Sequence, residues 1–117
     1  MKVIVCGGRD YFDREHLEET LDLFHARFPI THLIHGAAKG ADTLAKQWAE
    51  KNKIKDITAM PADLNTHGKR AGYIRNSAMA DLGPDLVICF PGGKGTMMMK
   101  GIAIERGIEV LDHYDIM

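Results

Sequence analysis

The chain has 117 residues, the size of one compact domain, and leaves no room for a second domain. Fifteen basic and sixteen acidic residues give a formal net charge of −1, so the chain as a whole does not attract nucleic acid or an anionic membrane surface. We therefore expect any anion to be bound locally.

The sequence carries few signals for membrane insertion, secretion or disulfide formation. No apolar stretch approaches the roughly 20 residues of a membrane span. The short apolar run after Met1 is interrupted by Arg9 and Asp10, so no signal peptide is evident and we expect a soluble cytoplasmic protein. Cys6 and Cys89 lie inside apolar, strand-like runs, which favours reduced core residues over a disulfide framework or a metal motif.

Strand-like and helix-like segments alternate along the chain. Unbroken apolar runs predict buried strands, and apolar residues three or four apart predict helices. In chain order we expect a strand at Lys2–Cys6, a helix at Asp13–Phe28, a strand at Thr31–His35, a helix at Gly40–Asn52, a strand at Ile54–Met60, a helix at Gly72–Leu82, a strand at Asp85–Phe90, a helix at Thr96–Arg106 and a last strand at Glu109–Leu111. Ala62–Arg70 has no apolar period and is expected to be a surface loop.

This alternation predicts an α/β fold, a Rossmann-like three-layer sandwich. Apolar strand interiors indicate a mostly parallel five-stranded sheet that is covered by helices on both faces. Repeats, low-complexity tracts and linkers are absent, so residues 1–117 are expected to form a single nucleotide-binding domain. In such sheets ligands bind beyond the carboxyl ends of the strands, where the winding reverses.

Three glycine-containing loops follow predicted strands. They are residues 7–10 (GGRD), residues 36–42 (GAAKGAD) and Pro91–Thr96 (PGGKGT). A helix begins with unpaired amide groups and a partial positive charge, and glycines let an anion come close to these groups. The alternative is that the glycines only form tight turns between strand and helix. The candidate ligand-binding residues in these loops are Gly7, Gly8, Arg9, Gly36, Lys39, Gly40, Asp42, Gly92, Gly93, Gly95 and Thr96.

Each charged residue in these loops has two possible interpretations, one in ligand binding and one in structure. Arg9 could pair with a phosphate or with a neighbouring surface aspartate. Lys39 could be a phosphate lysine or a solvated one, because the loop is not a GxxxxGK[ST] motif. Asp42 could cap its helix, or contact a ribose hydroxyl or a catalytic water.

Polar residues outside the loops add further candidates. Arg75 and Asn76 stand at the start of an otherwise apolar helix, which favours a role in the cleft over simple solvation. His35 could be an acid–base group or a half-buried residue at a strand end. The basic loop that holds His67, Lys69 and Arg70 could close over a ligand or stay exposed. The histidine spacing does not predict a metal site, and no cofactor is expected.

Four segments together carry a family resemblance. They are CGGRDY at residues 6–11, HGAAKGADTLA at 35–45, AGYIRNSAMA at 71–80 and PGGKGT at 91–96. Over nearly its whole length the chain resembles the SLOG superfamily of Rossmann-like proteins, and within it the YspA-type, DUF2493-like group. That superfamily includes the LOG nucleoside 5′-monophosphate phosphoribohydrolases and the DNA-processing protein DprA. The resemblance implies a site for a nucleotide or a nucleotide-derived ligand.

The chain departs from the LOG enzymes after its last glycine motif. In LOG enzymes glutamates follow this motif and serve cleavage of the N-glycosidic bond, whereas here Met97, Met98 and Met99 follow. Cleavage passes through a cationic sugar that needs a nearby carboxylate, which methionine does not supply. The weak catalytic candidates are therefore Asp42, Arg75, which loosely matches a LOG arginine, and Glu105, if it reaches the cleft.

Three functions stay open on this basis. The favoured one is binding of a nucleotide-derived ligand by a sensor or sequestering module. The alternatives are a nucleoside-monophosphate phosphoribohydrolase or NAD-type N-glycosidase, and a DprA-like binder of single-stranded DNA, against which the net charge argues. Because the related enzymes are commonly dimers, we also expect a homo-oligomer.

Overall fold

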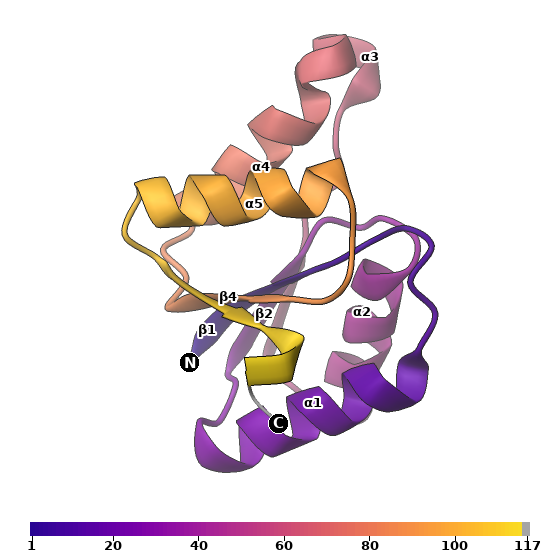
Figure 1. The fold of residues 1–117 in the computed structure, drawn as a ribbon, viewed down its shortest axis with the longest axis vertical. Helices are drawn as coiled ribbons and strands as arrows, with labels where there is room; N and C mark the ends of the chain where they lie inside the picture. Colours follow the sequence, from indigo (N-terminus) through magenta and orange to yellow (C-terminus); the bar gives the residue numbers. More distant parts are fainter. Residues whose placement is uncertain (116–117) are drawn as a thin grey trace.

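The computed structural model describes residues 1–115, which form a five-stranded, all-parallel sheet with helices on both faces (Figure 1). The strands are β1 (Lys2–Cys6), β2 (His32–His35), β3 (Asp56–Ala59), β4 (Leu86–Cys89) and β5 (Glu109–Asp112). The helices are α1 (Arg14–Arg27), α2 (Ala41–Lys51), α3 (Leu64–His67), α4 (Ala71–Asp81) and α5 (Lys94–Glu105), with the 3₁₀ turns η1 (Gly68–Arg70) and η2 (His113–Asp115). The predicted Rossmann-like three-layer architecture is confirmed.

Each face of the sheet buries its own hydrophobic core, because successive strand residues point to opposite sides. Val3 and Val5 of β1 face α1 and α2, where Trp48 is buried and donates from Nε1 to Asp22 Oδ1 at 2.9 Å. Ile4 of β1 faces the second core, to which Met79 of α4 and Met99 of α5 contribute. Strands buried on both sides explain the unbroken apolar runs in the sequence.

The order of the strands fixes where a ligand can enter. It is β3-β2-β1-β4-β5, so the chain winds outward from β1 to β3 and then crosses back to β4 on the other side of β1. β1 and β4 are in register, with Cys6 opposite Cys89. The winding therefore reverses between the carboxyl ends of β1 and β4, which is the position of ligand crevices in open parallel sheets.

The predicted surface loop at Ala62–Arg70 is wrong in part, because α3 and η1 lie within it. Asp63 caps α3 by accepting the Thr66 amide hydrogen at 3.0 Å. None of the residues of α3 or η1 is buried, so this short helix leaves no apolar period to find in the sequence. In Figure 1 the segment projects beyond the layers at the far end of α4.

Other boundaries differ by a few residues at most. The third strand begins at Asp56 instead of Ile54, whose side chain is buried in the core beside α2. Asp13 caps α1, since its Oδ1 accepts the His16 amide hydrogen at 3.1 Å. Within residues 1–115, no helix combines the length and apolarity that a bilayer crossing requires.

Candidate functional site

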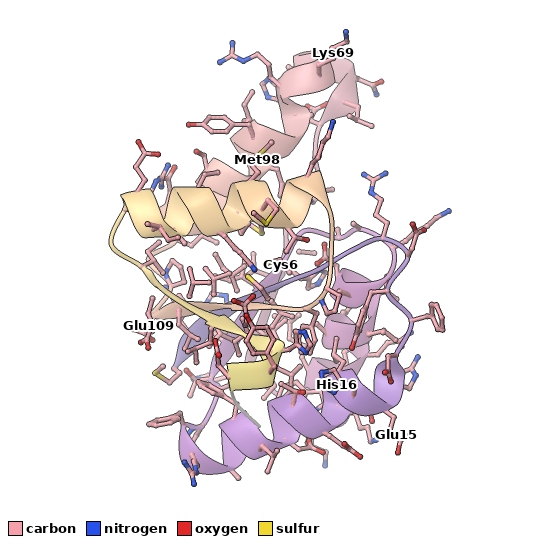
Figure 2. The ribbon with its side chains drawn as sticks, in the orientation of Figure 1. Cys6, Glu15, His16, Lys69, Met98 and Glu109 are labelled. Atoms are coloured by element: carbon pink, nitrogen blue, oxygen red, sulfur yellow. The ribbon has the colours of Figure 1, made fainter. Side chains whose placement is uncertain are left out.

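A cavity of about 660 Å³ opens beyond the carboxyl ends of β1 and β4. The cavity is lined by residues 6–11 at the end of β1 and in the loop after it, by Ala38 and Asp42 after β2, by Met79 of α4, and by residues 91–96 in the loop after β4 and the first turn of α5. Each of the three glycine loops therefore contributes to one cavity at the reversal point of the sheet. Figure 2 shows Cys6 in the interior between the sheet and α5.

Backbone hydrogen bonds hold these loops against one another. The Gly8 amide donates to the Pro91 carbonyl at 2.8 Å, and the Ala41 amide donates to the Gly8 carbonyl at 3.1 Å. The loop after β1 is thereby tied to the loop after β4 and to the start of α2. The amide of Gly8 is consequently engaged within the protein, so it is not available to a ligand.

Several glycines serve this close packing. Gly40 has a φ of +77°, and a Cβ there would collide with the Gly8 carbonyl oxygen. A Cβ at Gly92 would collide with Thr96 Oγ1, and one at Gly7 would lie 2.6 Å from the Ala41 Cβ. For these glycines the turn-forming reading from the sequence accounts for the residue type.

Gly93 and Gly95 differ from these glycines. Both line the cavity, and a Cβ built on either would have no heavy atom within 4 Å in the described part of the chain. They flank Lys94, the first residue of α5. The amide groups of Lys94, Gly95 and Thr96 donate to no acceptor among residues 1–115, as expected for the first turn of a helix. This part of the wall combines open space, free amides and the positive end of a helix dipole, which suits an anion.

Four charged side chains line the cavity. Arg9 and Lys94 make no hydrogen bond or ion pair with any residue in 1–115, so both cations are available to a ligand. Asp10 is exposed at the rim. Asp42, the other carboxyl group in the wall, is buried.

The surroundings of Asp42 have opposing effects on the pKa of its carboxyl group. Burial raises the pKa of its carboxyl above the usual aspartate range, while the Ala38 amide and the guanidinium of Arg75 partly oppose this shift. Its Oδ2 accepts the Ala38 amide hydrogen at 3.2 Å, which fixes the loop before α2. A carboxyl with a raised pKa on a cavity wall can accept a hydrogen bond from a sugar hydroxyl or exchange a proton with one.

Arg75 and Asn76 lie behind the cavity wall and do not line it. Arg75 Nη1 donates to the Gly36 carbonyl at 2.5 Å, and Arg75 Nε donates to Asn76 Oδ1 at 2.8 Å. Asn76, which is 3% exposed, donates from Nδ2 to the Gly95 carbonyl at 3.3 Å. The pair connects α4 to two of the three loops, so these are positioning residues.

The remaining residues singled out from the sequence lie outside this cavity. Lys39 and Gly40 line a neighbouring cavity, and Gly36 lies against the Arg75 side chain. Glu105 is the last residue of α5, exposed, at the opposite end of the helix from the cavity. Met99 is buried in the core. Among the described residues, His, Cys, Asp and Glu form no cluster that could hold a metal ion.

Some wall residues were not among the sequence candidates: Cys6, Asp10, Tyr11, Ala38, Met79, Pro91 and Lys94. Most of them stand inside the glycine motifs, so the motif boundaries could have identified them. Met79 carries no such signal, because an apolar residue on a helix reads as core. Burial raises the pKa of Tyr11 to about 12, and its hydroxyl has no hydrogen-bond partner in residues 1–115.

The two cysteines are buried and reduced, as predicted. Their Sγ atoms lie 3.4 Å apart across β1 and β4. Contact with Cys89 and burial raise the pKa of the Cys6 thiol well above its usual value. Cys6 therefore presents a neutral, weakly polar group to the cavity.

A parallel sheet with a glycine-lined cavity at its reversal point defines a Rossmann-like α/β domain. The sequence model of the YspA, cpYpsA-related SLOG family matches residues 1–67, more than half of the chain, and the chain belongs to this family. The match covers the first two glycine loops. The chain is also similar to the Gene 61 protein of Mycobacterium phage D29, with 32% identity over 122 aligned positions that cover 97% of each chain.

Proposed function

We propose that the protein binds a nucleotide or a nucleotide-derived ligand, with a phosphate group at the first turn of α5. The observation that carries this proposal is the open wall at Gly93 and Gly95, where three unpaired amides meet the cavity. Close packing accounts for Gly7 and Gly40 in the other two loops, because a Cβ there would collide with neighbouring atoms. Packing does not require glycine at positions 93 and 95. Membership of a SLOG family supports a nucleotide-related ligand.

The rest of the wall suits the remainder of such a ligand. Arg9 and Lys94 both line the cavity and supply positive charge for the proposed phosphate. Cys6, Tyr11 and Met79 supply less polar surface for a ribose or a base. A cavity of about 660 Å³ lies in the range of small-molecule sites.

A matched pair of glycine substitutions tests the proposal. Gly95 and Gly101 both lie in α5, and a Cβ on either has free space. Alanine at either position favours the helix by up to about 1 kcal/mol. We expect Gly95→Ala to fold and to weaken AMP binding at least tenfold, because its methyl group covers the amides, while Gly101→Ala binds as the parent does. Isothermal calorimetry measures both, and equal binding by the two variants contradicts the phosphate position.

Hydrolysis of an N-glycosidic bond is the second candidate function. It is favoured by Asp42, a buried carboxyl on the cavity wall whose pKa burial raises. A group of this kind can activate water or stabilise a cationic sugar. Incubation with AMP, CMP and NAD, followed by chromatography for free base, tests the activity. We expect Asp42→Asn to abolish any release and Glu105→Gln, outside the cavity, to leave it unchanged.

Two expectations from the sequence stay predictions. A homo-oligomer is tested by light scattering across micromolar concentrations, where a monomer contradicts it. Single-stranded DNA binding is disfavoured by the net charge of −1. A salt-sensitive shift of a DNA strand at submicromolar protein would support it nonetheless.

A further inference from the structure

A second cavity, of about 490 Å³, adjoins the first. It lies between the loop after β1 and the start of α2. Its walls are Arg9, Asp10, Tyr11, Phe12, Arg14, Lys39, Gly40, Thr43, Leu44 and Gln47. Three of these residues, Arg9, Asp10 and Tyr11, also line the first cavity. The two cavities are therefore neighbours across one short segment of chain.

The second cavity is positively charged although the chain is not. Arg9, Arg14 and Lys39 face one carboxylate, Asp10. Lys39 makes no hydrogen bond or ion pair with any other residue between 1 and 115. Arg14 is held in place, because its Nη2 donates to Gln47 Oε1 and its Nη1 lies 3.5 Å from Glu18. A wall with one fixed and two uncommitted cations favours a second anionic group.

The spacing of the two cavities is fixed by the backbone. Gly40 packs against the Gly8 carbonyl with a positive φ, and the Ala41 amide donates to the same carbonyl oxygen. The start of α2 therefore cannot move away from the loop after β1 without breaking this contact. The two cavities therefore keep a fixed position relative to each other, and Arg9 lines both of them.

We propose that the second cavity holds the second half of a dinucleotide whose first phosphate lies at α5. This assignment rests on the proposed function. The bridging phosphate group lies beside Arg9, which both cavities share, and Lys39 contacts the anionic charge of the second half. Phe12, 88% exposed at the rim, offers its ring face to the second base. A mononucleotide fills the first cavity and leaves these groups without a ligand.

Calorimetry with three probes tests this assignment. The affinity for AMP measures binding in the first cavity alone. The affinities for diadenosine diphosphate and for the dinucleotide pApA measure binding across both cavities, and these two probes differ in how their halves are joined. We expect at least one dinucleotide to bind tenfold or more tightly than AMP. Lys39→Ala should remove that gain and leave AMP affinity unchanged, whereas Lys55→Ala, an exposed lysine outside both cavities, should change neither.

The outcomes separate the two proposals. Equal affinity for AMP and both dinucleotides, or an equal loss for all three in Lys39→Ala, overturns the second subsite and keeps the proposed function. A long single-stranded oligonucleotide that binds far more tightly than either dinucleotide overturns it in favour of nucleic acid. If none of the probes binds, the proposed function fails and the second subsite falls with it.

Discussion

Asn76 Nδ2 donates a hydrogen bond to the carbonyl oxygen of Gly95, at 3.3 Å, and so joins the buried side of α4 to the first turn of α5. Asn76 in turn accepts from Arg75, which holds Gly36. The glycine wall of the cavity is thus supported from behind by two adjacent side chains. Preorganised amides can bind an anion without first ordering a loop, which keeps the entropic cost of binding low.

Asn76→Ala tests this support. The substitution removes the side chain of Asn76, which is 3% exposed, and with it the part-buried hydrogen bonds to Arg75 Nε and to the Gly95 carbonyl, which together contribute about 1–3 kcal/mol. We expect urea denaturation to show a loss of that size, and AMP binding to weaken because the wall is no longer held. Asn65→Ala, at an exposed position of α3, serves as the control. Unchanged stability in Asn76→Ala would contradict the buried network.

Arg75→Gln should change the titration of Asp42. The guanidinium of Arg75 lowers the pKa of the Asp42 carboxyl against the larger raising effect of burial. Removing the positive charge should therefore raise this pKa further, which an NMR titration of the Asp42 carboxyl carbon measures. Arg106→Gln should leave it unchanged, because Arg106 bonds to Ser77 and Asp81 at the other end of α4. An unchanged or lower pKa of Asp42 in Arg75→Gln would contradict this effect of the Arg75 charge.

Gly40→Ala should destabilise the protein more than an ordinary helix substitution. A φ of +77° is costly for any residue with a Cβ, and the added methyl group would collide with Gly8. We expect a loss of at least about 1–3 kcal/mol in the free energy of unfolding. Gly72→Ala, in α4 with free space and no positive φ, should be neutral or stabilising. Equal stability of the two variants would contradict the packing at Gly40.

The fold was open to prediction because its signals are local. Runs such as Leu86–Cys89 are apolar on both faces, which is typical of a parallel sheet covered by helices. Parallel strands bring their carboxyl ends to one edge, so the convergence of the glycine loops on one cavity followed from their order in the chain. The short helix α3 escaped prediction because none of its residues is buried.

The roles of particular side chains were harder to predict. Helical periodicity assigns Arg75 and Asn76 to a face of α4 but does not say that backbone carbonyls of Gly36 and Gly95 lie opposite that face. The glycine pattern alone likewise does not separate Gly92, which packing requires, from Gly95, which has free space. These distinctions depend on contacts between loops far apart in the sequence.

Stability should fall at mildly acidic pH through His35. Burial lowers the pKa of this histidine below its usual value, and the nearby charge of Lys46 adds to the effect, opposed by Glu50. Its Nδ1 accepts the Ala37 amide hydrogen at 3.0 Å, and Nε2 has no partner among residues 1–115. The folded state therefore prefers the neutral ring, and the unfolded chain binds more protons once the pH falls below about 6.5.

The direction of this pH dependence follows from linkage. The contribution of neutral His35 to the free energy of unfolding is fully present above the unfolded-state pKa of about 6.5 and is lost as the pH falls below it. We expect the melting temperature to drop from pH 7.5 to pH 5.5, by less in His35→Asn, which keeps an acceptor for Ala37 and does not titrate. The pKa of His113 is also lowered by burial and by His16. His113→Phe should therefore remove a further part of the pH dependence of the melting temperature. Parallel pH profiles for the parent and His35→Asn would show that His35 does not carry this dependence.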